Sequence, residues 1–333
     1  MAEGQLLATV VIPTFNGDVY LRRILDALQS QDVEGEFEIL VIDSGSTDST
    51  LEIVRSFPSV RLHTIPNEEF GHGKTRNLAA QLARGEFVAY LTHDAIPSHD
   101  GWLRELLEPF SMSERIVAVM GKQIPRPFCF PLMRYEIFGV FAQFGPDFGT
   151  TVFHADPSLS ATEQPDSITF YSDVNSAVRR EFLVSTISYR DVAYAEDQMF
   201  GRDLIGAGFW KAYAPRASVE HSNDVTLHEF GLRIFDETVG LRRIGTPISP
   251  MTRAILLRVW ARSSFGDARR IARDPLFSMK RKLYWQVVNP LFQFRKWSSY
   301  RRASNLSLED TVAILAGSLE HSRKKSLRSP NLR

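Results

Sequence analysis

Several features are scarce or missing in this 333-residue sequence, and each one limits what the protein can be. Cys129 is the only cysteine, so one chain cannot form an internal disulfide, and a reducing compartment is favoured. No uncharged apolar run approaches the roughly 18 residues of a membrane-spanning helix. The N-terminus also lacks the basic and apolar regions of a signal peptide. We therefore expect a cytoplasmic protein.

Net charge is missing as well, but the zero balance hides an asymmetry. Residues 251–333 carry 18 Lys and Arg against 5 Asp and Glu, whereas the first 250 residues carry 21 against 34. A basic tail suggests an anionic partner or docking against the acidic body, and a solvated helical face explains it equally well.

Aromatic side chains interleave with the basic residues of this tail. The pattern is typical of an amphipathic segment on a membrane surface, and equally of a helix that packs on another subunit. Peripheral contact with the inner face of the cell membrane and a homo-oligomer both stay open. The aromatic residues concerned are Trp260, Phe265, Phe277, Tyr284, Trp285, Phe292, Phe294 and Trp297.

Short apolar runs alternate with helical periodicity over the first 120 residues. This βαβαβαβαβ order predicts an α/β fold, with a mostly parallel sheet that carries helices on both faces. The expected strands are 8–13, 37–43, 60–65, 86–92 and 116–120.

The remainder of the chain is less regular. Residues 122–170 are rich in Pro, Phe and Gly, so we predict irregular structure there. A helix is expected over 196–207, short strands over 209–213 and 217–221, and mainly helices from Leu227 onward. The predicted domains are 1–248, with a nucleotide-binding half (about 1–121) and an acceptor and catalytic half (about 122–248), and a basic helical region over 249–333.

Polar residues follow the first two expected strands. Pro13, Thr14 and Asn16 end the first strand, and Asp43 ends the second, before a loop of small residues. Asp43 can accept hydrogen bonds from a nucleobase or ribose, and the small residues let a nucleotide approach closely. Ordinary turn and cap functions are the alternative. The glycine spacing of a Walker loop or a dinucleotide fingerprint is absent.

Two glycines and two cations begin the helix after the third strand. In Phe70-Gly-His-Gly-Lys-Thr-Arg-Asn77, the residues Lys74, Arg76 and Asn77 lie in the first helical turn. A helix N-terminus with basic side chains attracts a diphosphate. Cations are unfavourable there for the helix itself, so a purely structural explanation fits less well.

The fourth strand ends at Thr92-His-Asp-Ala-Ile-Pro97, where Asp94 is a candidate ligand for Mg²⁺ or Mn²⁺. His93 could be a second ligand, a substrate donor or a packed side chain. His221, at the end of a later strand, could join the aspartate on the metal.

An acidic pair, Glu196 and Asp197, follows Tyr194 at the start of a helix. The helix dipole alone favours acids there. The pair could equally supply a general base, for which Asp197 is our choice.

The order and spacing of these motifs resemble the inverting family 2 glycosyltransferases of the GT-A fold, and most closely the bacterial rhamnosyltransferase-like branch. The rhamnosyltransferase-like character lies mainly in 70–77 and 92–97, and 172–180 also fits. The stretches that carry the resemblance are Val11–Asn16, Val41–Thr50, Glu69–Asn77, Leu91–Pro97 and Ala195–Arg202.

The resemblance implies a role for each matching residue. Pro13, Thr14 and Asp43 would hold the nucleobase and ribose, and Arg76 would face the nucleotide. Asp94 would hold a divalent cation on the diphosphate, with His221 as a further ligand. Asp197 would deprotonate the acceptor. Asp173 and Asn175 would line the donor or acceptor pocket, and Tyr194 is included with them.

The metal motif departs from the family. An Asp-X-Asp pattern is common there, but this chain has Thr92, His93, Asp94 and Ala95, so one carboxylate remains. The synthase motif that follows the acidic helix in processive cellulose- or chitin-like enzymes is also absent.

The implied activity is transfer of a sugar, L-rhamnose from dTDP-rhamnose, to a glycan or lipid-linked glycan in cell-surface polysaccharide synthesis. Alternatives are a UDP-sugar donor and a non-catalytic sugar-nucleotide-binding protein. A nucleotidyltransferase is the second choice among enzymes, but it would need a Gly-rich basic N-terminal loop, and Pro13-Thr-Phe-Asn16 is not one. A nucleic-acid partner is disfavoured because the body is acidic and the tail has no recognisable motif.

Overall fold

The computed structural model describes residues 6–160, 163–319 and 321–323. It divides into two compact units. The first runs through Pro127 and resumes over Ile137–Ser222, and the second comprises Phe128–Glu136 and the chain from Asn223. The main part of the second unit thus begins at Asn223, earlier in the chain than the predicted boundary at 248/249. The reason is that α9 (Leu227–Arg243), which we had placed in the first domain, packs on α11 (Met279–Asn305).

The first unit is built on one sheet with the order β3-β2-β1-β4-β8-β6-β9-β5, and β7 pairs with β9. Strands β1 to β4 are mutually parallel, β6 and β9 are parallel, and β5, β7 and β8 run antiparallel to their neighbours. The strands are β1 (Ala8–Thr14), β2 (Phe37–Asp43), β3 (Val60–Thr64), β4 (Phe87–Leu91), β5 (Ile96–Pro97), β6 (Ile116–Ile124), β7 (Thr151–Phe153), β8 (Asn175–Arg179) and β9 (Trp210–Glu220).

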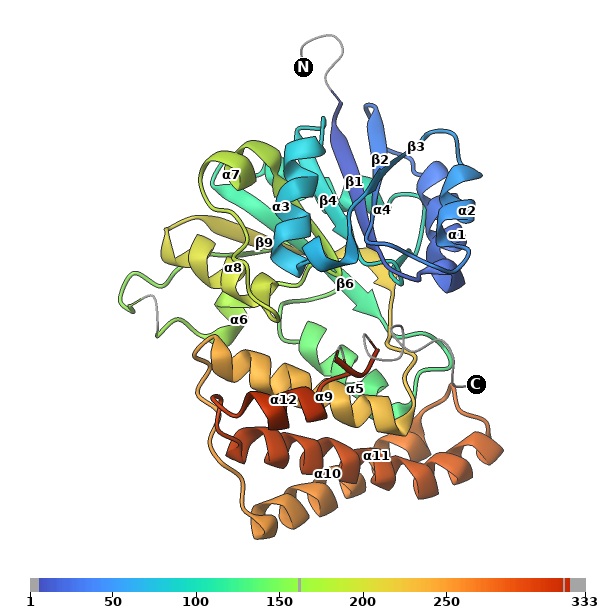
Figure 1. Cartoon of the computed structure of the whole chain (residues 1–333), viewed down its shortest axis with the longest axis vertical. Coiled ribbons are helices and arrows are strands. Elements are labelled where there is room, and N and C mark those ends of the chain that lie inside the picture. The colour runs from blue at the N-terminus through green and yellow to red at the C-terminus, as the bar shows by residue number, and fades with distance from the viewer. Residues whose placement is uncertain (1–5, 161–162, 320, 324–333) are drawn as a thin grey trace. The chain divides into compact units, whose positions relative to one another are not determined.

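Helices cover both faces of this sheet (Figure 1). Alternate strand residues point to opposite faces, so Val10 and Ile12 join the core under α1, α2 and α4, while Val11 joins the core under α3, α7 and α8. These elements are α1 (Asp18–Gln29), α2 (Thr50–Arg55), η1 (Asn67–Glu69), α3 (His72–Leu82), α4 (Trp102–Leu107), η2 (Glu108–Ser111), α6 (Asp166–Thr169), α7 (Arg180–Ser185) and α8 (Glu196–Gly206).

Two local expectations were wrong. The stretch 122–170 contains α5 (Pro131–Phe141), because Pro131 stands at the first helical position, where a missing N–H costs nothing. The two short strands expected over 209–221 form one strand, β9. Strand β8 enters the sheet antiparallel between β4 and β6, which the βα alternation did not indicate.

The second unit is helical, as expected. It contains α9, α10 (Arg253–Arg273), α11 and α12 (Thr311–Gly317), together with the start of α5. Thr226 and Glu229 form a capping box that begins α9. Among the described residues, no helix is both long and apolar enough to cross a membrane.

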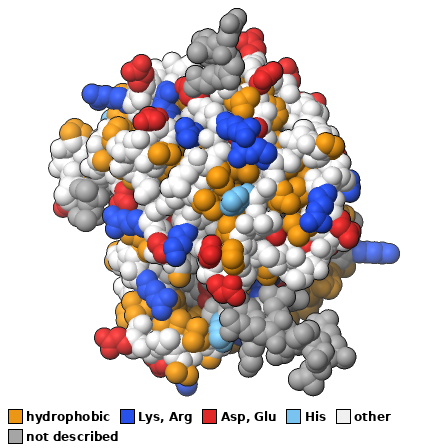
Figure 2. Space-filling view, turned by 45° about the horizontal axis from the view of Figure 1, so that its top comes forward, with side chains coloured by type: hydrophobic (Ala, Val, Ile, Leu, Met, Phe, Trp, Pro, Cys, Tyr) orange, Lys and Arg blue, Asp and Glu red, His pale blue; other side chains and the backbone are white. Residues whose placement is uncertain are grey.

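The surface mixes charge and apolar groups. On the face shown in Figure 2, Lys and Arg side chains are interspersed with Asp, Glu and hydrophobic side chains. This fits a chain whose basic and acidic residues balance.

Candidate active site

The loops that follow β1 and β2 are fastened together by Asp43. Asp43 Oδ2 accepts hydrogen bonds from Thr14 Oγ1 at 3.0 Å and Ser46 Oγ at 2.5 Å. Asp43 Oδ1 accepts from the backbone N–H groups of Gly45 at 3.0 Å and Ser46 at 2.9 Å. The carboxylate is 1% exposed, so its observed contacts shape the loop. Direct contact with a nucleotide stays a prediction, as it does for the half-buried Pro13 beside it.

Asn16 extends this network. It adopts a left-handed backbone with φ 49°, its N–H donates to Ser46 Oγ at 2.8 Å, and its Oδ1 accepts from Thr47 N at 2.8 Å. The neighbouring Gly17 lies against His93, since a Cβ on Gly17 would be 3.1 Å from His93 Cγ. The structure thus brings His93, from the end of β4, to the β1–α1 loop.

Asp94 and His221 meet, although 127 positions separate them. Asp94 Oδ2 lies 3.4 Å from His221 Nε2. His221 Nδ1 is 2.9 Å from Gln123 Oε1. An amide oxygen only accepts, so Nδ1 donates this bond and Nε2 faces the carboxylate. Burial by itself would raise the pKa of Asp94, but His221, together with His93 and Thr92, outweighs it and holds that pKa well below its usual range.

This pair fits a shared cation. A neutral Nε2 and a carboxylate oxygen both offer lone pairs, so their approach is favourable when a proton or a metal ion lies between them. A histidine whose other nitrogen is fixed by a hydrogen bond is typical of metal ligands. Within the described residues, however, no group of three or more His, Cys, Asp or Glu side chains could hold a metal.

Arg126 holds the backbone beside this pair. Its guanidinium donates to the carbonyl oxygens of Asp94 and Ser222, and it stacks 3.8 Å from the ring centroid of Tyr20. Arg126 thereby connects the end of β4 to the segment that follows β9. By binding both backbone segments, Arg126 holds Asp94 and His221 close to each other.

The start of α3 is used differently from our expectation. We had expected Asn77 to bind the sugar nucleotide, but its amide group is engaged with the backbone of Tyr189. Its Nδ2 donates to the Tyr189 carbonyl at 2.8 Å, and its Oδ1 accepts from Tyr189 N at 3.0 Å. A Cβ on Gly73 would lie 2.3 Å from the Arg190 carbonyl oxygen, so only glycine permits this approach. Lys74 pairs with Asp191 at 3.2 Å, and both side chains are 60% exposed.

Arg76 lies in a buried cluster of carboxylates. Its Nε is 3.2 Å from Asp173 Oδ2, and its Nη1 donates to Glu196 Oε1. The exposed side-chain fractions are 8% for Arg76, 0% for Asp173 and 7% for Glu196. Burial would lower the pKa of Arg76, but the two acids raise it overall. In this structure Arg76 therefore faces carboxylates, where we had expected a nucleotide.

Asp173 is held by three further groups. Its Oδ1 accepts from Ser176 Oγ at 2.7 Å and from Tyr189 OH at 2.8 Å, and its backbone N–H points at Asp197 Oδ2 at 3.4 Å. These contacts place Asp173 next to Asp197 in the interior. The carboxylate of Asp173 is buried and does not line an open pocket. This differs from the pocket role that we had expected.

Asp197 is the acid of this cluster that remains partly exposed. Its Oδ1 accepts from Gln198 N at 2.8 Å. Burial, followed by the charges of Glu196 and Asp173, raises its pKa well above the usual value. A carboxylate with a raised pKa that can reach solvent is a stronger base than an ordinary aspartate, as a general base must be.

Asn175 is a core residue and not a pocket residue. It is 1% exposed, accepts from Trp102 Nε1 at 3.0 Å and donates to the Ala217 carbonyl at 2.7 Å. Its amide therefore ties β8 to α4 and β9. Tyr194 is half-buried and precedes Ala195, whose left-handed φ of 63° begins α8.

Hydrogen bonds join these groups along one edge of the sheet. Thr92 N donates to the Val174 carbonyl at 3.3 Å, and Gln123 Nε2 donates to Ser172 Oγ at 3.2 Å. The Asp94 and His221 pair is thus connected to the segment that carries Asp173. The site lies beyond the carboxyl ends of β1, β2 and β4, where open α/β sheets bind ligands.

A mixed sheet covered by helices, with carboxylates beyond the carboxyl ends of its parallel strands, is the arrangement expected of a GT-A glycosyltransferase. The chain belongs to the family described as "Glycosyl transferase family 2", whose profile matches residues 9–185. It is therefore a glycosyltransferase.

Similar proteins agree with this assignment. The O-antigen chain rhamnosyltransferases RfbN of Salmonella typhimurium and WbaN of Salmonella anatum are each 28% identical over 301 residues, which cover 88% of this chain and 88% of the relative.

Two solved structures share the fold. TarS of S. aureus in complex with UDP has a TM-score of 0.50 and 18% identity, covering 90% of both chains. The mannosyltransferase PcManGT from Pyrobaculum calidifontis, in complex with GDP-Man and Mn²⁺, has a TM-score of 0.54 and 17% identity, covering 97% of this chain and 89% of that one. The predicted GT-A fold with a helical C-terminal region is confirmed.

Three residues of the site escaped the sequence analysis: Gln123, Arg126 and Tyr189. The first two lie at the edge of the stretch that we had expected to be irregular, and Tyr189 lies in a loop. Their roles depend on partners about 100 positions away, so no local pattern marked them.

Proposed function

We propose that this glycosyltransferase moves a sugar from a nucleoside diphosphate donor to a glycan or lipid-linked glycan acceptor with inversion at the anomeric carbon. Our preferred donor is dTDP-rhamnose, which is supported by the likeness to two O-antigen chain rhamnosyltransferases. The observation that carries the proposal is the partly exposed Asp197 beside a buried arginine and two further acids.

Asp197 acts as the base in this proposal. The acceptor hydroxyl attacks the anomeric carbon and transfers its proton to the Asp197 carboxylate. The new C–O bond forms as the bond to the diphosphate breaks, and the nucleoside diphosphate leaves with the electron pair. Glu196 and Asp173 raise the proton affinity of Asp197. Arg76 limits that rise and fixes the cluster, so its role is positioning.

Asp94 and His221 would hold a divalent cation, Mg²⁺ or Mn²⁺, with Gln123 orienting the histidine. When bound, the cation would neutralise negative charge on the donor diphosphate. Thr14, Asn16 and Asp43 shape the loop on which the nucleoside would rest, with Pro13 beside them. Lys74 pairs with the exposed Asp191, and both side chains are 60% exposed, so Lys74 could turn toward the donor phosphates.

A donor panel tests the proposal. The protein is incubated with dTDP-rhamnose, UDP-glucose, UDP-N-acetylglucosamine or GDP-mannose, each with Mn²⁺ and a lipid-linked glycan. We expect dTDP-rhamnose to raise the melting temperature by mass action. We also expect dTDP release and a gain of one deoxyhexose on the acceptor. Asp197→Asn is the matched control, which should bind the donor but not turn it over.

The outcomes separate the alternatives. Turnover of a UDP-sugar in preference to dTDP-rhamnose would show that the donor is a UDP-sugar, while the proposed reaction would stand. Stabilisation by a donor without any nucleoside diphosphate release, with several acceptors offered, would favour a non-catalytic binding protein.

A further inference from the structure

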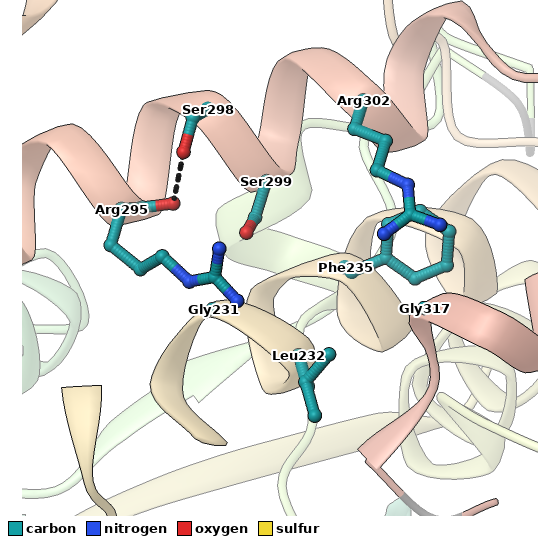
Figure 3. Close-up of a pocket in the computed structure, with 8 residues that line it drawn as sticks. All are labelled: Gly231, Leu232, Phe235, Arg295, Ser298, Ser299, Arg302 and Gly317. Carbon is teal, nitrogen blue, oxygen red and sulfur yellow. Dashed lines mark hydrogen bonds between the residues drawn. The ribbon is translucent and has the colours of Figure 1, made fainter. Parts of the chain in front are cut away.

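The second unit contains a pocket lined by two arginines and two serines. It measures about 200 Å³ and lies between α9, α11 and the end of α12. Figure 3 shows Arg295 and Arg302 reaching from α11 toward α9, with the Ser299 hydroxyl between them. One water needs only about 10–15 Å³ on such a measure, so the pocket admits a larger polar group.

The two arginines of this pocket contact neutral groups. Among the residues that the structure describes, neither guanidinium has a carboxylate partner. Arg302 donates to the Ala313 carbonyl at 3.4 Å and lies 5.0 Å from the ring centroid of Phe235. Arg295 Nη2 is 3.4 Å from His228 Nδ1, and Arg295 Nε is buried without a hydrogen-bond partner. Unmatched guanidinium donors in a concave site suit a phosphate group.

Gly231 makes room for this arrangement. A Cβ at this position would lie 2.0 Å from Arg295 Nε. Glycine inside a helix is unfavourable, so the close approach of the arginine is the structural reason for a glycine in α9.

An exposed apolar stripe on α11 leads to the same pocket. Leu283 is 65% exposed, Val287 73%, Leu291 55% and Phe294 46%, and they follow one another at spacings of four, four and three. Residues four apart are neighbours on a helix surface. Leu291 therefore adjoins Arg295, and Phe294 adjoins Ser298, so the stripe and the pocket form one continuous surface.

We propose that this surface seats the second unit on an anionic phospholipid membrane, with a lipid phosphate in the Arg295–Arg302 pocket and the stripe in the acyl boundary. Helices α10 and α11 carry 13 Lys and Arg against one acid, the buried Asp267. Two copies joined about a two-fold axis would oppose like charges, whereas an anionic leaflet complements them. The inference deepens the proposed function, since it places the enzyme where lipid-linked acceptors lie.

Vesicle sedimentation of the full chain, without donor or acceptor, tests it. Vesicles of phosphatidylglycerol and phosphatidylcholine are compared with phosphatidylcholine alone at physiological salt. A basic side chain near an anionic leaflet is worth roughly a fivefold change in binding, so Arg295→Gln with Arg302→Gln should lose about 25-fold. The matched control, Arg258→Gln with Arg262→Gln, removes two exposed arginines of α10 that do not line the pocket; if the phosphate sits in the pocket, this control should lose less than about fivefold.

Equal losses of vesicle binding in the two double variants would overturn the proposed phosphate site in the pocket, because the binding would then depend only on overall positive charge. Concentration-dependent dimerisation that Leu291→Ser abolishes would assign the stripe to a second copy. Stabilisation by inorganic phosphate that needs Arg295 and Arg302, without vesicle binding, would assign the pocket to a free anion. Sugar transfer to a soluble glycan acceptor is measured in parallel, so failure of this inference is distinct from failure of the enzyme proposal.

A second measurement does not depend on the arginine variants. An environment-sensitive fluorophore is attached at Leu291→Cys and, as a control, at Val19→Cys in the first unit, where the native valine is 72% exposed against 55% for Leu291. The native Cys129 is buried. Anionic vesicles should shift the emission to the blue only at position 291. An unchanged emission there would refute membrane seating.

Discussion

Replacing Arg76 with methionine should destabilise the first unit far more than any exposed ion pair could. Arg76 is the cation in contact with Asp173 and Glu196, and all three side chains are at most 8% exposed. Removing one partner from a buried pair typically costs about 3–5 kcal/mol, because the remaining charge is left uncompensated. With a urea m-value of about 2–3 kcal/mol/M, the midpoint should fall by roughly 1–2 M at pH 7.

Lys74→Met is the matched control for this measurement. Lys74 is a cation in the same helical turn and pairs with Asp191, but both side chains are 60% exposed. Exposed pairs contribute about 0–1 kcal/mol, so the midpoint should shift by less than about 0.4 M.

The pH dependence gives the stronger test. Burial already raises the pKa of Asp173 and Asp197 in the wild type. Acids with a raised pKa in the folded state destabilise it progressively as the pH rises above their unfolded value near 4. Without Arg76 their pKa values rise further, so the deficit of the variant should be larger at pH 8 than at pH 5. Urea unfolding at both pH values measures it. A deficit below about 1 kcal/mol, or one that shrinks as the pH rises, would refute the buried-cluster argument.

Four further outcomes are expected. Asp197→Asn should lower kcat by about 100- to 10,000-fold with donor affinity unchanged, measured by nucleoside diphosphate release and calorimetry; near-normal turnover would remove Asp197 from the role of base. Because the pKa of Asp197 is raised and only its ionised form accepts a proton, the acidic limb of kcat should lie well above pH 4, and a limb near pH 4 would contradict this. Asp94→Ala should abolish metal-dependent donor binding, a view that fails if wild-type affinity is the same with and without Mn²⁺. Burial lowers the pKa of Lys211 to about 7, so between pH 7 and 9 the wild type should gain about 1.4 kcal/mol per pH unit over Lys211→Met, and parallel stability curves would argue against it.

Much of the first unit could be predicted because local patterns dictate it. The apolar run of β1 and the helical spacing of Leu21, Ile24 and Leu28 fix the elements, and short parallel connections fix their hand. Strand β8 could not be predicted to lie between β4 and β6, since pairing across about 90 residues leaves no local pattern. The same holds for Asn175, which looked like a pocket residue and is a core clamp.

The sequence by itself determined the motifs at the strand ends, and with them the family and the type of reaction. Local sequence patterns place Asp43 and Asp94 at or just after strand ends and Asp197 in the first turn of a helix. Tertiary structure alone decided what each one faces. It joined His221 to Asp94 through Gln123, and it surrounded Arg76 with acids. Charge and pKa depend on distances between segments, and those distances arise only when the chain folds.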